Sequence, residues 1–176
     1  MEASEDKRIE YGELIKGIDT ARLIYIDESG MELNATNDKG WGKKGVILKG
    51  KKSGKYYQRT NIMAGYVNGE VIAPFVFNGS CDTALFEGWV EQFLIKELKP
   101  GQFVIMDNAA FHKSQKTKTL IESVGCQVIF LPPYSPDLNP IEKFWANLKR
   151  WIRNHINNFA TLSLAFDSFF SSPNST

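Results

Sequence analysis

The sequence predicts an α/β domain on a mixed five-stranded sheet, with three antiparallel strands, then two parallel strands, and helices flanking the sheet. Two patterns support this expectation: a hairpin signal at Asn68-Gly69 and a strand, helix, strand succession within residues 102–131. The chain has 176 residues, of which 43% are hydrophobic and 23% are charged. Such values are typical of one globular domain and exclude wholesale disorder and fibrous repeats.

The first half of the chain supplies the antiparallel strands. Residues 1–20 contain one apolar cluster and read as a linker, a fragment of a helix or a truncated N-terminal segment. The β-rich run 23–29 predicts a buried strand, and residues 61–77 form two β-rich runs around Asn68-Gly69. Because Asn-Gly is the strongest short hairpin signal, these three runs should form an antiparallel meander.

A helix should follow the meander. Asp82 or Thr83 can cap its start, and Pro100-Gly101 ends it after Leu98. Apolar residues at helical spacing form the side that we expect to be buried, namely Leu85, Trp89, Val90, Phe93 and Leu94.

The second half of the chain supplies the parallel strands. Residues 102–108 and 126–131 are apolar, strand-like runs, and the polar stretch from Ser114 to Val124 between them reads as a helix. This succession is a βαβ unit, whose two strands lie parallel in one sheet. A rigid, proline-rich loop over residues 131–140 follows.

A last helix should begin after this loop, with Asn139 as its N-cap and Pro140 in its first turn, and reach about residue 154 or 156. Its buried stripe should consist of Ile141, Trp145, Leu148 and Ile152. Residues 159–176 read as a loose C-terminal tail.

Composition narrows the function classes. No segment approaches the roughly 18 uninterrupted apolar residues of a membrane helix, and the polar first ten residues do not resemble a signal peptide, so we expect a cytoplasmic protein without a membrane partner. Two cysteines, Cys81 and Cys126, support neither a disulfide framework nor a zinc finger, and we expect both to be buried thiols. The net charge of +1, taken by itself, argues against a nucleic-acid partner.

That charge is unevenly distributed along the chain. The first 38 residues carry ten acidic and four basic side chains, whereas residues 39–59 carry eight basic side chains and no acidic one. This basic hairpin 39–59 also contains Trp41, Tyr56 and Tyr57, and it suits a nucleic-acid strand because cations neutralise phosphates and aromatic rings stack on bases. The alternative is a solvated, lysine-rich hairpin that protects a sheet edge.

Three acids stand at the ends of predicted elements. Asp27 lies in the first strand, Asp107 at the carboxyl end of the fourth, and Glu142 in the first turn of the last helix. If the βαβ unit packs beside the meander, these acids converge, and crowded carboxylates favour a hard cation such as Mg²⁺, with Mn²⁺ as a substitute. Two such ions can clamp the oxygens of a displacement at phosphorus. Taken singly, each acid has a simpler interpretation as a turn or capping residue.

The neighbours of these acids refine the set. Glu28 should point to the opposite sheet face from Asp27, and Asp137 lies in a turn, so we include neither. One face of the last helix combines the acid with two cations, through Glu142, Ala146, Lys149 and Arg153. These cations suit phosphates beside the metal ions, and the alternative is a solvated basic face.

In chain order, the strings YIDES, MDNAAFH and LPPYSPDLNPIEKFW resemble the catalytic core of the DDE transposases of the mariner and related bacterial insertion-sequence superfamily. The resemblance covers about residues 20–156. There are 34 residues between Asp107 and Glu142, the separation of one large branch of that superfamily. A glutamate in the third position, where other branches carry aspartate, places the chain nearer the insertion-sequence side.

The resemblance implies a ribonuclease-H-like fold over residues 21–158, with Asp27, Asp107 and Glu142 as catalytic ligands of two metal ions. It also implies that metal-activated water nicks DNA at the transposon ends and that the freed 3′ hydroxyl attacks target DNA, typically at TA, in a dimeric complex at the bacterial nucleoid. Asn108 and His112 match the family pattern as contacts to substrate or to a metal-bound water, and His112 also suits a structural role. The expected DNA contacts are Lys43, Lys44, Lys49, Lys51, Lys52, Lys55, Arg59, Lys149 and Arg153.

One feature of the family pattern is missing. Full transposases of this type carry helix-turn-helix domains before the core, and nothing in the first 20 residues resembles one. We therefore expect a split gene with a separately encoded helix-turn-helix part, a truncated copy, or a shortened form of a longer protein. Two other functions stay open: an inactive or domesticated DNA-binding remnant, and a ribonuclease-H-like, metal-dependent nuclease.

Overall fold

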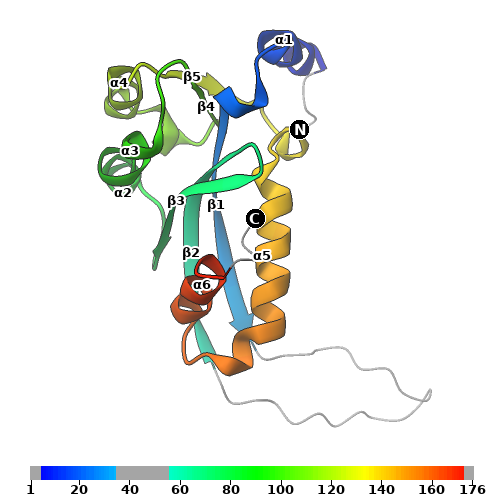
Figure 1. The fold of residues 1–176 in the computed structure, drawn as a ribbon, viewed down its shortest axis with the longest axis vertical. Helices are drawn as coiled ribbons and strands as arrows, with labels where there is room; N and C mark the ends of the chain where they lie inside the picture. The colour runs from blue at the N-terminus through cyan, green and yellow to red at the C-terminus, as the bar shows by residue number, and fades with distance from the viewer. Residues whose placement is uncertain (1–4, 35–55, 173–176) are drawn as a thin grey trace, which may run out of the picture.

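The computed structural model describes residues 5–34 and 56–172 (Figure 1). Its sheet has five strands in the order β3-β2-β1-β4-β5. β1 pairs antiparallel with β2 and β2 with β3, whereas β4 lies parallel to both β1 and β5. The predicted mixed sheet of three antiparallel and two parallel strands is therefore confirmed. The strands are β1 (Leu23–Asn34), β2 (Tyr56–Val67), β3 (Glu70–Phe77), β4 (Phe103–Met106) and β5 (Gln127–Phe130).

The hairpin between β2 and β3 turns at the predicted dipeptide. Asn68 has φ 49° and Gly69 has φ 92°, and two consecutive left-handed residues are what a tight two-residue hairpin turn requires. β1 is longer than the predicted run 23–29, because its backbone stays paired with β2 as far as Asn34, opposite Tyr56. Long-range pairing extends this strand through residues with little strand propensity of their own.

Helices cover both faces of the sheet (Figure 1). On one face, α2 (Thr83–Trp89), the π-helical turn η2 (Val90–Leu94), α3 (Ile95–Glu97) and α4 (Gln115–Ser123) pack against the apolar side chains of β1 and β4. On the other, α5 (Ile141–His155) and α6 (Leu162–Phe170) pack against β1 and β2. Short 3-10 turns span Thr20–Arg22, Ala110–Lys113, Pro136–Leu138 and Ile156–Asn158.

The helix after the meander departs from the prediction at its centre. Asp82 caps it, its side chain accepting from the Leu85 backbone N–H at 2.8 Å. The π-helical turn places residues five apart on one side, so Leu94 follows Trp89 into the core. Phe93, which we predicted to be buried, is therefore 41% exposed and lies beside Phe75 on β3.

Helix α5 carries the buried stripe that its periodicity predicts. Ile141, Trp145, Leu148 and Ile152 are each at most 1% exposed. The start of α5 differs by one residue, since Pro140 takes the N-cap position instead of Asn139. Asn139 is buried, and its side-chain oxygen lies 3.4 Å from the Ile141 backbone N–H.

Both ends of the described chain are ordered elements. Residues 5–15 form helix α1 (Glu5–Ile15), in agreement with the helix alternative for this segment and not with a linker, and its Tyr11 is buried against Leu23 and Ile105. The expectation of a loose tail is wrong for α6, because Thr161 caps this helix and its apolar side chains join the core of α5.

The prediction that both cysteines are buried is confirmed for one of them. Cys126 is buried as predicted, whereas Cys81 is half-buried, and both thiols are free. Across residues 5–34 and 56–172, none of the helices has the length and apolar character that spanning a membrane requires.

Candidate active site

The three predicted acids line one cavity. Asp27, Asp107 and Glu142 border a space of about 380 Å³ together with Asn108, Asn139 and the proline-rich loop over residues 131–136. They come from β1, from the end of β4 and from the first turn of α5. The structure thus brings together side chains that are up to 115 residues apart in the sequence.

Strand geometry explains why the two aspartates meet. The parallel ladder between β1 and β4 ends at the pair Tyr25 and Ile105. Asp27 and Asp107 each follow that pair by two residues, so both lie just beyond the point where the ladder ends. Carboxyl ends of parallel strands are where α/β folds place their sites.

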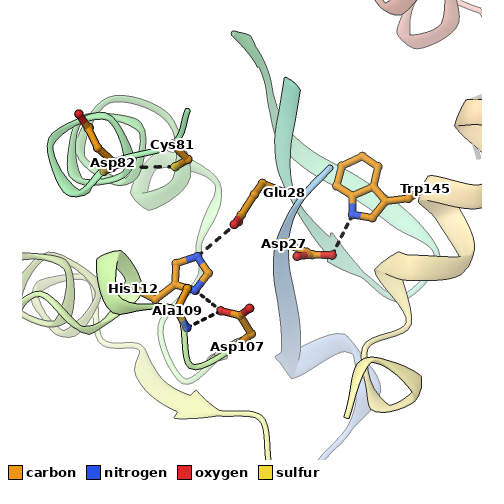
Figure 2. Close-up of polar contacts among 8 residues, drawn as sticks. All are labelled: Asp27, Glu28, Cys81, Asp82, Asp107, Ala109, His112 and Trp145. Atoms are coloured by element: carbon orange, nitrogen blue, oxygen red, sulfur yellow. Dashed lines mark hydrogen bonds and ion pairs between the residues drawn. The ribbon is translucent and has the colours of Figure 1, made fainter. Parts of the chain in front are cut away.

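Asp27 is held by α5. The indole Nε1 of Trp145 donates a hydrogen bond to Asp27 Oδ2 at 3.1 Å (Figure 2). Burial raises the pKa of Asp27 to about 7, the nearby Glu28 and Glu142 carboxylates add to this effect, and the Trp145 bond acts in the opposite direction. Among the described residues, carboxylates therefore repel one another at Asp27, and no positive charge contributes to its pKa.

Asp107 lies in a different electrostatic environment. Its Oδ1 accepts from the backbone N–H of Ala109 at 2.8 Å and from Nδ1 of His112 at 2.6 Å (Figure 2). The hydrogen bond from His112 lowers the pKa of Asp107. Burial lowers the pKa of His112, but the hydrogen bond to Asp107 and the negative charge of Glu28 outweigh it and raise the pKa to about 9, so both ring nitrogens carry protons at neutral pH.

Glu28 is the residue that the sequence analysis excluded and the structure returns to the site. It leaves β1 on the opposite face from Asp27, as predicted, and its Oε2 lies 3.5 Å from Nε2 of His112 (Figure 2). The sequence held a signal for this contact. Strand alternation directs Glu28 to the sheet face where the turn Ala110–Lys113, which carries His112, lies. His112 itself is buried and bonds Asp107, which favours the structural alternative over a direct contact to substrate.

Asn108 and Asp137 tie the loop in place. The Asn108 side-chain amide donates to the Leu131 carbonyl at 2.5 Å, which joins the end of β4 to the start of the proline-rich loop. Asp137 accepts two hydrogen bonds from the Arg8 guanidinium, at 2.6 and 3.0 Å, so α1 holds the same loop from outside. The prediction that Asp137 stands apart from the acid set agrees with this arrangement.

A second cavity runs along α5 from the site. It has a volume of about 480 Å³. Glu142 lines both cavities, and Trp145, which bonds Asp27, lines the second one. Its walls confirm that Glu142, Ala146, Lys149 and Arg153 share one face, and they add the cation Arg150, which the spacing argument missed.

Of the other predicted DNA contacts, the structure describes Arg59. Arg59, on β2, is exposed and lies 3.7 Å from Glu32. The remaining six, Lys43, Lys44, Lys49, Lys51, Lys52 and Lys55, lie outside the described residues together with Trp41, and the basic hairpin stays a prediction.

The donor chemistry of the acid cavity fits a hard divalent cation. Three carboxylates offer only oxygen atoms, the ligands that Mg²⁺ and Mn²⁺ prefer. After burial, the Glu28 and Glu142 carboxylates contribute to the raised pKa of Asp27, and a cation would offset their negative charge. As they stand, the side chains of residues 5–34 and 56–172 form no group of three or more His, Cys, Asp or Glu that could hold a metal ion. The residue types therefore suit the cation, and the arrangement of the three acids is more open than a closed metal cage.

Comparison with known proteins identifies the family. The sequence model described as DDE superfamily endonuclease matches residues 22–163. The chain belongs to this family. The DDE match includes all three acids of the cavity and the whole of α5.

One relative of this DDE chain belongs to an insertion element. It is 32% identical over 145 residues to the insertion element IS630 uncharacterized 39 kDa protein of Shigella sonnei, which covers 76% of this chain and 39% of the relative. The chain therefore spans about two fifths of that relative's length.

Solved structures share its fold. The Mos1 transposase paired-end complex with left transposon end matches 99% of the chain and 57% of its own, with a TM-score of 0.71 and 15% identity. The mariner Mos1 paired end complex with Mg matches 96% and 53%, with a TM-score of 0.68 and 14% identity. The expected ribonuclease-H-like transposase fold is thus confirmed.

Proposed function

We propose that this chain is the catalytic domain of an insertion-element transposase, which cleaves DNA at the element's ends and joins those ends to target DNA. One observation carries the proposal: Asp27, Asp107 and Glu142 line a single cavity in a chain of the DDE endonuclease family. The mobile-element relative and the shared fold with Mos1 transposase support it.

The proposed reaction assigns a task to each part of the site. Asp27, Asp107 and Glu142 would hold divalent cations, Mg²⁺ or in its place Mn²⁺ and two in number, which when bound activate a nucleophilic oxygen and neutralise charge at phosphorus. Trp145 fixes the orientation of Asp27 by its hydrogen bond, and Asn108 fixes the loop that closes the cavity. Lys149, Arg150 and Arg153 supply positive charge along α5 beside the acids, where a DNA backbone would pass.

The partners of the reaction belong to the same proposal. They are DNA of the transposon ends, a target that includes TA, a separately encoded helix-turn-helix part and a second copy of the chain in the DNA complex. The DNA complexes formed by Mos1 transposase support the first of these. We place the protein at the nucleoid in the bacterial cytoplasm, which the bacterial source of the relative supports.

A cleavage and joining assay tests the proposal. The protein is incubated with labelled duplexes that carry the element's ends, a TA-containing target, and Mg²⁺ or Mn²⁺, with and without a helix-turn-helix partner. We expect products with the wild-type chain and none with Asp107→Asn or Glu142→Gln. Asp137→Asn is the matched control, because it makes the same change in an acid that bonds Arg8 and does not line the cavity.

The outcomes separate the competing functions. Binding of end DNA without cleavage under any metal would favour an inactive or domesticated remnant. Cleavage without joining, and without preference for the element's ends, would favour a general metal-dependent nuclease. Products that persist in Asp107→Asn would contradict the assignment of the acids.

A further inference from the structure

The surroundings of His112 connect the two faces of β1. The histidine side chain is completely buried, and its ring lies 4.5 Å from the ring of Phe86 and 4.4 Å from that of Phe111, measured between centroids. Aromatic packing on this scale fixes the plane of the imidazole. Each ring nitrogen then faces a different carboxylate, Nδ1 toward Asp107 and Nε2 toward Glu28.

We propose that Glu28 is a positioning residue of the active site, which acts through His112 to fix the carboxylate of Asp107. This inference rests on the proposed function, in which Asp107 is a metal ligand. It gives a role to Glu28, which lies on the opposite face of β1 from Asp27 (Figure 2).

The first step of the argument is the orientation of Asp107. Its Oδ1 accepts both the Ala109 backbone N–H and His112 Nδ1. Two donors on one oxygen hold the carboxylate in one rotation, so a ligand in the cavity meets the other oxygen, Oδ2. The direction of that oxygen depends on where His112 holds its ring.

The second step is the dependence of His112 on Glu28. Among the described residues, neither Nε2 of His112 nor Oε2 of Glu28 has a hydrogen-bond partner, and both atoms are buried. They lie 3.5 Å apart, slightly beyond a hydrogen bond, and each supplies the opposite charge that the other needs away from water. Removing the charge of Glu28 leaves Nε2 buried without compensation, which favours a shift of the ring.

The third step is the place of Glu28 on β1. Adjacent residues of one strand then serve the same site from opposite faces, Asp27 by facing the cavity and Glu28 by supporting His112. Partners that orient a ligand residue in this way typically change metal affinity or activity by about 10- to 100-fold when they are replaced. A residue with a purely structural role would change thermal stability instead.

The test compares the wild-type chain with Glu28→Gln and with Glu32→Gln. The control makes the same chemical change four residues along β1, in an exposed acid that pairs with Arg59. The chain contains two histidines, so ¹⁵N-histidine labelling reports His112 with His155 as an internal reference. We expect Glu28→Gln, without metal, to move the Nε2 resonance of His112 and leave both resonances of His155 in place.

Metal binding provides the second measurement. Titration calorimetry with Mn²⁺ should show a Kd about 10- to 100-fold weaker in Glu28→Gln and unchanged in Glu32→Gln. In a His112→Asn background, adding Glu28→Gln should change that Kd by less than about twofold, because the path through the ring is already lost. An equal loss in both backgrounds would overturn the proposal.

The resonance and the affinity also separate this inference from the proposed function. A wild-type chain that binds no Mn²⁺ and cleaves no DNA contradicts the function, and the His112 resonances then decide the position of the ring. Unmoved His112 resonances in Glu28→Gln overturn the inference, whatever the activity of the wild type. A lower melting temperature with unmoved resonances and an unchanged Kd would likewise assign Glu28 a structural role.

Discussion

Replacing Asp27 with asparagine should stabilise the metal-free protein at alkaline pH, even though it removes an acid of the site. Burial, followed by the carboxylates of Glu28 and Glu142, raises the pKa of Asp27 to about 7. Asparagine has almost the same size and no charge, and its amide oxygen can still accept the hydrogen bond from Trp145. The substitution therefore removes the repulsion and keeps the contact.

The magnitude follows from proton linkage. An aspartate pKa that rises from 3.8 to about 7 on folding corresponds to up to about 4 kcal/mol. The folded state binds this proton more tightly than the unfolded state, so the stability it contributes is complete below about pH 4 and is lost as the pH rises through 7. The asparagine variant has no such loss. Its advantage should be near zero at pH 4 and reach its full value above about pH 7.

Urea unfolding at pH 4 and pH 8.5, with a chelator present, measures this difference. Asp137→Asn provides a control of opposite sign, because the hydrogen bond from Arg8 lowers the pKa of Asp137. Added Mg²⁺ should restore the wild-type chain at pH 8.5 and leave the asparagine variant less affected. If wild type and Asp27→Asn lose stability in parallel between the two pH values, the placement of Asp27 among uncompensated carboxylates is wrong.

Trp145→Phe should raise the pKa of Asp27 further, because the lost hydrogen bond had lowered it. Carbon NMR of the Asp27 carboxyl group measures the titration midpoint, and an unchanged or lower midpoint would count against this reasoning. Phe169→Ala should cost about 3–5 kcal/mol in urea unfolding, since Phe169 is 6% exposed. Leu164→Ala in the same helix, at a side chain 49% exposed, should stay within about 0.5 kcal/mol, and similar costs for both would refute the packing of α6. Combined Lys149→Ala and Arg153→Ala should weaken DNA binding in fluorescence anisotropy and reduce the salt slope by up to about 2, whereas Lys96→Ala on α3, across the sheet, should not.

Local signals predicted the elements best where one residue type decides the backbone. Asn68-Gly69 specifies a tight hairpin because both residues accept positive φ, and the stripe through Trp145 specifies the buried side of α5. The two aspartates followed from strand pairing, because β1 and β4 are adjacent and parallel and Asp27 and Asp107 both lie just beyond the end of their shared ladder.

Tertiary contacts decided the rest. No pattern in the sequence signals the π-helical turn that rotates Phe93 outward, because the turn depends on how the helix packs against the sheet. Alternation correctly placed Glu28 on the far face of β1, but it could not show that His112 bridges that face to Asp107. The end of β1 depends on pairing with β2, which lies across 21 residues outside the described chain.

Helix α6 extends past the end of the match to the family. The match to the DDE family ends at residue 163, two residues into α6, while the aromatic cluster continues to Phe169. Phe169 lies 6.0 Å from Phe144, which lies 5.3 Å from Trp145, the donor that holds Asp27. Trimming the chain to residues 22–163 would therefore remove aromatic side chains that pack behind Trp145, the residue that orients an acid of the site.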